Sequence, residues 1–363
     1  MVSKACIVGT YQKKLEEMAS ASPDLALTVV VPPAWRDDRG VTKLERAHTN
    51  GYQLEIQPLA LNGSFHLHFY PNLGRVLDAA KPDLVHIDEE PYNFATYHAN
   101  RLARRIGAKT LWFSWQNLER RYPPPFSWME RYNLHHVDYA LVGSHAAAEV
   151  WRAKGCSAPI AVIPQFGVDP DLFHPPTEPR PSTPVHIAYV GRLVPEKGVD
   201  LLLSALRQVR GGWKATILGS GPVETSLREQ AEALELGDRV TFEAWKPSSR
   251  MPEFYRTVDI LVVPSRTRPN WIEQFGRVLI EAMASGVAVV GSNVGEIPHV
   301  IGEAGKLFPE EGADALASHL TTLVENVELR RDLGRRGRAR VKRHFTQRQV
   351  AEATLAIYRE ILS

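Results

Sequence analysis

Short apolar runs recur along the chain and alternate with longer segments in which apolar residues repeat every three or four positions. Such runs, bounded by Gly, Pro or Asp, are typical of strands buried on both faces, and the longer segments are typical of amphipathic helices. In the first half, the pattern predicts strands at Ala5–Val8, Leu25–Val31, Leu54–Pro58, Leu84–Asp88, Thr110–Ser114, Tyr139–Val142 and Ile160–Ile163. It predicts helices at about Gln12–Ser20, Arg75–Ala80, Ala95–Arg105, Trp128–His135 and Ala146–Lys154. This alternation predicts an α/β fold with a doubly wound sheet.

One strand–loop–helix–strand unit in the second half carries most of the candidate chemistry. A strand is expected at Ile260–Val263, a helix from about Gly276 and a second strand at Val287–Val290, as in a crossover of a parallel sheet. Glu273 lies in the loop and Glu281 lies in the first turns of the helix. Both carboxylates can therefore point to the carboxyl edge of the strands, where open α/β sheets bind ligands.

The start of this helix is a candidate anion site. The N–H groups of Phe275, Gly276 and Arg277 lie in its first turn, where backbone donors are unpaired, and Gly276 permits close approach of a ligand. A carboxylate on each side suits a ligand that is anionic in the middle and carries hydroxyls at both ends, as a nucleotide sugar does. The alternative is that Glu273 and Glu281 are solvated surface groups.

The string EQFGRVLIE, followed by AMASGVAVV and GEIPHVI, resembles the retaining glycosyltransferases of family 4. The resemblance covers the chain from Val185 to its end. It implies the GT-B fold, in which two Rossmann-like doubly wound domains face each other across a cleft. It also implies an NDP-sugar donor, a saccharide or lipid-linked acceptor, no metal and no further cofactor, and a role in polysaccharide or glycoconjugate assembly.

The resemblance also implies roles for individual residues. Arg192 and Lys197 form an Arg-x4-Lys pair that would hold the donor diphosphate, and Glu273 would bind hydroxyls of the transferred sugar. Fixed cations at the leaving diphosphate stabilise the transition state more than the ground state. The alternative is a solvated basic loop. The remaining expected donor contacts are Gly9, Gly191, Gly219, Gly221, Gln274, Phe275, Gly276, Arg277 and Glu281, the last of these on the ribose hydroxyls.

Two polar loops in the first half could face the acceptor. They are formed by Glu89, Glu90, Tyr92 and Asn93 after one strand, and by Gln116 and Asn117 after the next. Alternatively, the two acids cap the following helix. Gln116 cannot act as a base near neutral pH. In the retaining mechanism implied by the resemblance, the leaving phosphate itself takes the acceptor proton.

The length of 363 residues exceeds one typical domain, and 44% hydrophobic residues suffice for full cores. We expect an acceptor-binding domain at 1–175, a Pro-rich linker at 176–184 and a nucleotide-sugar-binding domain at 185–344. The segment 345–363 is expected to form a helix that crosses back to the first domain.

Charge, cysteine content and hydropathy narrow the partners and the location. A net charge of +2 argues against nucleic acid as the main partner. Cys6 and Cys156 form no disulfide framework, which favours a reducing cytoplasm, and no apolar run is long enough to span a membrane. We therefore expect a cytoplasmic protein, with peripheral contact at the inner membrane face as an open option.

That option depends on the basic and aromatic segment from Glu119 to His136. Relatives in the family often use lipid-linked acceptors at a membrane surface. An interfacial patch could be formed by Arg120, Arg121, Tyr122, Phe126, Trp128 and Arg131. The alternative is that Phe126 and Trp128 pack under the loop.

Three other features favour structural roles. Asp169 and Asp171 are expected to form a turn, and the run Arg335–Arg340 a solvated helix face. His66 and His68 alternate along a possible strand without a third metal ligand nearby.

Two other functions remain open on the same fold, a nucleotide-sugar 2-epimerase and a catalytically silent nucleotide-sugar-binding protein.

Overall fold

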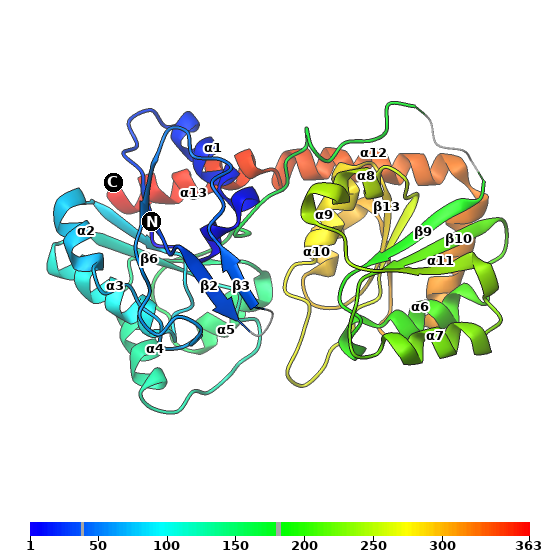
Figure 1. The fold of residues 1–363 in the computed structure, drawn as a ribbon, viewed down its shortest axis with the longest axis horizontal. Helices are drawn as coiled ribbons and strands as arrows, with labels where there is room; N and C mark the ends of the chain where they lie inside the picture. The colour runs from blue at the N-terminus through cyan, green and yellow to red at the C-terminus, as the bar shows by residue number, and fades with distance from the viewer. Residues whose placement is uncertain (38–39, 179–182) are drawn as a thin grey trace. The chain divides into compact units, whose positions relative to one another are not determined.

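The computed structural model describes residues 1–37, 40–178 and 183–363, and the chain divides into two compact units (Figure 1). The first unit contains Met1–Gly167 and Gln347–Ser363, and the second contains Val168–Thr346. Of the expected linker at 176–184, residues 179–182 lie outside the described residues. Both units combine helices with parallel sheets, which confirms the predicted α/β class.

The first unit alternates strands and helices close to the predicted positions. Its parallel strands are β1 (Thr28–Val31), β4 (Gln53–Ile56), β5 (Leu84–Ile87), β6 (Lys109–Ser114), β7 (Tyr139–Val142) and β8 (Ile160–Val162). Its α-helices are α1 (Lys13–Ala21), α2 (Leu73–Ala80), α3 (Phe94–Arg105), α4 (Phe126–His135), α5 (His145–Ala153) and α13 (Gln347–Leu362). β1 pairs with β4, and β5, β6, β7 and β8 follow one another in the sheet, while β2 (Ala34–Asp37) and β3 (Gly40–Lys43) form an antiparallel hairpin.

Helices cover both faces of this sheet. On one face, α1 and α13 pack against each other and bury Leu15 and Leu355 with Val29 of β1. On the other face, Leu77 of α2 and Ala103 of α3 pack in one cluster with the adjoining strands. β7 is buried throughout, and β1, β5 and β6 are buried except at their first residue, which explains why these strands are continuous apolar runs in the sequence.

The predicted strand at Ala5–Val8 is wrong. Two 3₁₀ helices, Ala5–Ile7 and Gly9–Tyr11, occupy this position. The Cys6 N–H donates to Ser3 Oγ at 3.3 Å, and Ser3 Oγ donates to Asp88 Oδ2 at 2.5 Å, so the chain turns out of the sheet directly after Val2. Cys6 and Ile7 of this apolar run are still buried, but they lie in a 3₁₀ turn and not in a strand.

The second unit contains a six-stranded parallel sheet. Its strands are β9 (Val185–Val190), β10 (Trp213–Leu218), β11 (Val240–Glu243), β12 (Ile260–Val263), β13 (Ala288–Ser292) and β14 (Lys306–Phe308). Its α-helices are α6 (Val199–Leu206), α7 (Glu224–Ala233), α8 (Met251–Tyr255), α9 (Arg277–Ala284), α10 (Ile297–Ile301), α11 (Ala313–Glu325) and α12 (Val327–His344). α6 packs with α7 and α11, while α12 packs with α9 and β13, and Figure 1 shows α6 and α7 on the opposite side of the sheet from α8 and α12.

The strand order in this sheet is β11-β10-β9-β12-β13-β14. The chain moves outward from β9 in one direction and then resumes on its other side with β12, so the order reverses between these two strands. In open parallel sheets, ligands bind at the carboxyl ends of the strands at such a reversal point. The loops after β9 and β12 are therefore the first place to look for a site.

Three expectations about structural features have mixed outcomes. The Asp169 carboxylate accepts from the Asp171 N–H at 2.9 Å, which confirms the turn. The strand expected through His66 and His68 is wrong, because this segment forms turns. None of the helices within the described ranges is both long and apolar enough to cross a lipid bilayer.

The expected solvated basic face on α12 is wrong for two of its arginines. The Arg338 guanidinium donates to the carbonyls of Phe173 at 3.0 Å and Pro170 at 3.2 Å, and to the carbonyl of Ala284. The Arg340 guanidinium donates to the Val300 carbonyl at 2.9 Å. Both guanidinium groups donate several hydrogen bonds, which connect α12 to backbone carbonyls of other segments of the second unit.

Candidate active site

The loops after β9 and β12 lie side by side in the second unit. The Arg266 N–H, after β12, donates to the Glu196 carbonyl, after β9, at 2.8 Å. Gly198 has φ +66°, and a Cβ atom there would stand 2.0 Å from the Pro264 carbonyl oxygen. Only glycine fits this backbone and this approach, so Gly198 fixes the short 3₁₀ turn Pro195–Lys197 against the end of β12.

This turn presents Lys197 to Glu273. The Lys197 Nζ lies 2.6 Å from Glu273 Oε2, and the Ser265 hydroxyl donates to the same oxygen at 3.0 Å. Glu273 is 7% exposed, while the Lys197 ammonium also lies 4.6 Å from the centre of the Trp271 ring. The sequence predicted Lys197 and Glu273, but neither Ser265 nor Trp271, since a serine and a tryptophan in a loop carry no distinctive signal.

α9 begins at the predicted position, with Gly276 at its N-cap and Glu281 within the helix. Gly276 has φ +76° at the N-cap, and Arg277 Nε lies 2.9 Å from Glu281 Oε1. The buried Tyr255 hydroxyl donates to Glu281 Oε2 at 3.2 Å. Burial raises the pKa of Glu281 above its usual range, although Arg277 and the Tyr255 hydrogen bond oppose this change. Two donors thus hold a buried carboxyl in one orientation.

The other predicted donor-side residues of this unit occupy close turns. A Cβ atom on Gly219 would stand 1.8 Å from the Gly191 carbonyl oxygen, and one on Gly221 would stand 2.2 Å from the Leu193 carbonyl oxygen. The turn after β9 is fixed by the Tyr189 hydroxyl, which donates to the Arg192 carbonyl at 2.7 Å. The Arg192 side chain is exposed to solvent.

Gln274 and Phe275, which precede the helix cap, point in different directions. Gln274 is exposed, whereas Phe275 is buried and its ring packs at 5.9 Å against the ring of Phe345. A donor contact by Phe275 would therefore have to come from its backbone.

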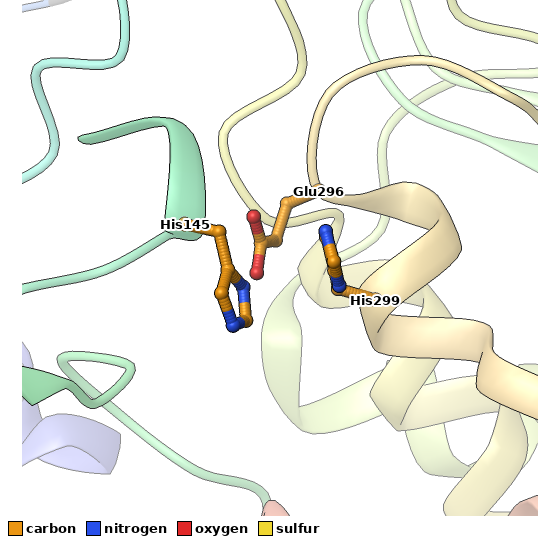
Figure 2. A group of neighbouring side chains, drawn as sticks. All are labelled: His145, Glu296 and His299. Carbon is orange, nitrogen blue, oxygen red and sulfur yellow. The ribbon is translucent and has the colours of Figure 1, made fainter. Parts of the chain in front are cut away.

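The GEIPHVI segment continues the site on α10. The Glu296 N–H donates to the Glu273 carbonyl at 3.2 Å, so the start of α10 supports the loop that carries Glu273. Glu296 is buried and His299 is exposed, and Figure 2 shows both side chains on one side of α10. Figure 2 also draws His145, which opens α5 in the first unit. We expected no metal, and this stays a prediction.

In the first unit, Glu89 is held by Lys4 and His68 rather than by a helix start. The Lys4 Nζ lies 2.9 Å from Glu89 Oε2, the Lys4 N–H donates to Oε1 at 3.1 Å, and His68 Nε2 lies 3.5 Å from Oε2. Burial alone would raise the pKa of Glu89, but Lys4 and His68 outweigh it and lower that pKa to about 2. Glu89 is therefore an anion at every physiological pH.

Glu90 reaches across to the end of the neighbouring strand. Its carboxylate accepts from the Ser114 hydroxyl at 2.6 Å and from the Trp115 N–H at 2.8 Å. Burial raises the pKa of Glu90 to about 7, although both hydrogen bonds oppose this change. The alternative that these acids cap α3 is wrong, because the two carboxylates bind other partners and the N-cap of that helix is Asn93.

The other predicted acceptor-side residues lie around these carboxylates. The Tyr92 ring stacks on Tyr122 at 4.4 Å, and Asn93 Oδ1 lies 3.3 Å from His66 Nδ1. Gln116 Nε2 donates to the Leu118 carbonyl at 3.0 Å, and Asn117 is buried.

Gly9 has a local partner of its own. Its N–H donates to Glu45 Oε2 at 2.6 Å, and a Cβ atom there would stand 2.8 Å from Ala47 Cβ. A donor contact at Gly9 stays a prediction, and it would require this hydrogen bond to be exchanged.

Comparison with known families covers both units. A family described as "Glycosyl transferase 4-like domain" matches residues 9–165, and one described as "Glycosyl transferases group 1" matches residues 173–340. The chain belongs to the group 1 glycosyl transferases. The glycosyltransferase family inferred from the EQFGRVLIE string is thereby confirmed as group 1, and the match extends to the first half of the chain, while retention of configuration stays a prediction.

Curated relatives of this group 1 glycosyl transferase act in different systems. The chain is 31% identical over 219 residues to the amylovoran biosynthesis glycosyltransferase AmsK of Erwinia amylovora, covering 56% of this chain and 54% of that protein. It is 29% identical over 213 residues to a GDP-mannose-dependent α-(1-6)-phosphatidylinositol monomannoside mannosyltransferase of Mycobacterium tuberculosis, covering 54% and 55%. The chain thus spans about half the length of these curated relatives.

The fold of the group 1 glycosyl transferase is shared with solved structures. HepE of Anabaena, crystallised in complex with UDP, has a TM-score of 0.73 at 19% identity, with 99% of this chain and 98% of that chain covered. At this identity the similarity establishes the fold, which is GT-B as predicted.

The segment from Glu119 to His136 has both exposed and half-buried side chains, and its contact with a membrane stays a prediction. Trp128 is 64% exposed, so the alternative in which it packs under the loop is wrong. Phe126 is half-buried, with its ring 5.1 Å from that of His66, and Tyr122 is half-buried as well. Arg120, Arg121 and Arg131 are exposed.

Proposed function

We propose that this chain is a retaining glycosyltransferase that moves a hexosyl group from an NDP-sugar to a saccharide or lipid-linked acceptor. The observation that carries the proposal is the Lys197–Glu273 pair at 2.6 Å, set where the strand order of the second sheet reverses. An ammonium and a carboxylate at this position match the two ends of a sugar diphosphate, one anionic and one rich in hydroxyls.

Lys197 and Arg192 would bind the diphosphate. On donor binding, the Lys197 ammonium would turn from Glu273 to the phosphate oxygens, while the exposed Arg192 would supply a second cation. Glu273, still held by the Ser265 hydroxyl at 3.0 Å, would then accept hydrogen bonds from the sugar. Fixed cations at the place where charge develops on the leaving group support transfer without a divalent metal.

Glu281 would bind the ribose. Its two carboxylate oxygens are already oriented by Arg277 Nε at 2.9 Å and the Tyr255 hydroxyl at 3.2 Å. Each oxygen keeps a second acceptor position for a ribose hydroxyl. An acceptor group oriented in advance loses less entropy when the ligand binds.

The chemical step would break the bond between C1 of the sugar and the diphosphate oxygen, and would form a bond between C1 and the acceptor oxygen on the same face. The acceptor proton would pass to the leaving diphosphate, so no side-chain base is required. Glu89, Glu90, Tyr92, Asn93, Gln116 and Asn117 would orient the acceptor in the first unit.

Two observations support a saccharide or lipid-linked acceptor: the names of two relatives and the exposed residues around Trp128. One relative is named for amylovoran biosynthesis and another for a phosphatidylinositol mannoside. The exposed Trp128 with Arg120, Arg121 and Arg131 supports contact with anionic lipid during transfer to a lipid-linked acceptor. Liposome sedimentation of the native chain and of Trp128→Ala tests this contact, and absence of lipid binding by the native chain contradicts it.

A thermal-shift panel of UDP-, GDP-, ADP- and TDP-sugars tests the donor site. A ligand present at 100 times its dissociation constant stabilises the folded chain by about 2.7 kcal/mol, which is visible as a raised midpoint. We expect one nucleotide to raise the midpoint of the native chain and to lose most of that effect in Glu281→Ala.

Glu232→Ala is the matched control, because Glu232 is an exposed glutamate of α7 in the same unit. It should keep the full shift. If no nucleotide sugar stabilises the native chain, the donor site is wrongly assigned.

A further inference from the structure

The loop between β12 and α9 holds Trp271 at one end of a short hairpin. Arg268 and Trp271 form an antiparallel bridge, in which the Arg268 N–H donates to the Trp271 carbonyl at 2.8 Å and the Trp271 N–H donates to the Arg268 carbonyl at 3.1 Å. Pro269 and Asn270 make the turn between them, and both residue types favour turns. The backbone at Trp271 is therefore fixed within the loop.

The segment after Trp271 is fixed by close contact with the loop that follows β13. Gly295 has φ +53°, and a Cβ atom there would stand 2.2 Å from the Glu273 carbonyl oxygen and 2.8 Å from Ile272 Cγ2. The Glu296 N–H donates to the same carbonyl at 3.2 Å. Trp271 and Glu273 thus flank a stretch of backbone that has little freedom to move.

The Lys197 ammonium contacts both of these side chains. Its Nζ lies 2.6 Å from Glu273 Oε2 and 4.6 Å from the centre of the Trp271 ring. A cation over an indole face is attracted by the electron density of the ring, and the attraction is stronger where water is partly excluded. Lys197 and Trp271 are half-buried and Glu273 is buried. The ring and the carboxylate therefore border one space, which the ammonium occupies.

Departure of the ammonium changes the chemistry of this space. In the proposed function, Lys197 turns to the diphosphate when the donor binds. The Trp271 face then loses its cation, and Glu273 keeps the Ser265 hydroxyl at 3.0 Å but loses its countercharge. A buried carboxylate without its countercharge is unfavourable, so the ligand group that enters this space has to donate hydrogen bonds to it.

A ring face and a carboxylate on one space select for a sugar. One face of a pyranose carries C–H groups, whose hydrogens bear partial positive charge and pack against the electron-rich face of an indole. The hydroxyls at the rim of the same pyranose donate to an ionised carboxylate, which only accepts. A sugar acid suits the space less well, because its carboxylate would meet the like charge of Glu273 and the negative face of the ring.

We propose that Trp271 binds the transferred sugar, and that the space between Trp271 and Glu273 takes a neutral pyranose. In the empty site the ring helps to hold the Lys197 ammonium at Glu273. In the complex the same ring face packs on the C–H face of the sugar. This assignment rests on the proposed function, since it requires Lys197 to turn to the diphosphate.

Calorimetry of the full chain separates the sugar contact from the diphosphate contact. The probes are UDP, GDP and ADP, each compared with its neutral hexose ester: UDP-glucose, GDP-mannose or ADP-glucose. Trp271→Leu should weaken binding of the hexose ester about 3- to 10-fold, because the ring contact is lost. It should not weaken binding of the diphosphate alone, because Lys197 no longer has to leave the ring, and this binding also shows that the variant is folded.

Two further variants check the cause. Trp271→Phe keeps a ring face and should recover most of the lost affinity. Phe242→Leu is the matched control, because it also removes a ring under a cation, with the Arg228 guanidinium of α7 at 4.7 Å. It should leave the affinities for both ligands unchanged.

Three outcomes would overturn the proposal. Equal weakening of diphosphate and hexose ester in Trp271→Leu would mean that the ring only supports the loop, and no weakening of either would mean that it contacts neither. Tighter binding of the hexuronate ester than of the hexose ester of the same nucleotide would exclude a neutral sugar. If none of the three diphosphates binds the native chain, the donor site of the proposed function fails, and this assignment fails with it.

Saturation-transfer NMR detects the ring contact directly. Irradiation of the aromatic protons of the native chain should transfer magnetisation to the C–H protons on one face of the bound sugar. The transfer should be much smaller in Trp271→Leu, while transfer to the base stays the same. Equal transfer to the sugar from both proteins would contradict a contact with Trp271.

Discussion

Replacing Glu90 with Gln should change how the stability of the first unit depends on pH. The Glu90 carboxylate accepts two hydrogen bonds, from Ser114 and Trp115, yet burial raises its pKa from 4.5 to about 7. The folded chain therefore binds this proton more tightly than the unfolded chain does. Stability is then highest while Glu90 is protonated and falls as the pH rises from 4.5 towards 7.

The size of the effect follows from that interval. At about 1.4 kcal/mol per pH unit, the full difference would lower the free energy of unfolding by about 3 kcal/mol. Glu90 keeps partial contact with solvent, so we expect a loss of about 1–2 kcal/mol over this range. Glu90→Gln does not titrate and should lack this part of the pH dependence.

Glu89→Gln is the matched control, because the adjacent carboxyl has the opposite sign. Lys4 and His68 outweigh the effect of burial and lower the pKa of Glu89 from 4.5 to about 2. Its stabilising contribution is therefore present above pH 4.5 and is lost as the pH falls towards 2. Glu89→Gln should destabilise the first unit by about 2–3 kcal/mol at pH 7, and by less at lower pH.

Urea denaturation between pH 4.5 and 7.5, read by hydrogen-exchange mass spectrometry of peptides from the first unit, follows the Glu90 effect across its interval and measures the Glu89 effect at its full size, which should stay constant over this range. The native chain should lose stability relative to Glu90→Gln as the pH rises. Parallel pH profiles for these two proteins would refute the reasoning about burial at Glu90.

Three further predictions concern the second unit. Lys197→Met removes the ammonium beside the buried Glu273 and leaves the hydrogen bond from the Ser265 hydroxyl, and it should lower turnover of a donor about 10²–10³-fold. In Lys197→Met/Glu273→Gln, recovery of stability without recovery of turnover would show that loss of the ion pair destabilises the single variant. Tyr255→Phe removes one hydrogen bond to Glu281 and should cost about 1 kcal/mol in urea denaturation and weaken donor binding in calorimetry; unchanged binding would show that Glu281 needs no orientation. Arg338→Met should lower the Tm by several degrees because it frees the Phe173 and Pro170 carbonyls, whereas Arg336→Met, which removes an exposed pair with Asp332, should leave it unchanged; equal effects would mean that Arg338 is merely a surface charge.

Strands buried on both faces could be predicted closely from the sequence. Ile260–Val263 and Tyr139–Val142 have the same bounds in the structure, because every residue in them is apolar and every residue is buried. The same signal failed at Ala5–Val8. Cys6 and Ile7 are buried there too, but in a 3₁₀ turn that depends on a hydrogen bond to Asp88, far along the chain. An apolar run indicates burial and does not by itself identify a strand.

The candidate site shows a similar division. Glu273, Glu281 and Lys197 could be predicted because they lie at fixed spacings in one motif-rich stretch and one turn. Tyr255 could not, because its contact with Glu281 depends on how α8 packs against α9. The direction of the Glu90 side chain could not be predicted from the sequence either, because its partner Ser114 belongs to another strand.

The stereochemistry of donor cleavage tests the central claim most directly. The nucleotide sugar that raises Tm in the panel would be incubated with the native chain, and the anomeric proton of the first sugar released to water would be followed by NMR. We predict that the configuration of the donor is retained, and that the rate falls in Lys197→Met. Release of the inverted anomer, or no cleavage and no transfer with a donor that binds, would contradict a retaining glycosyltransferase.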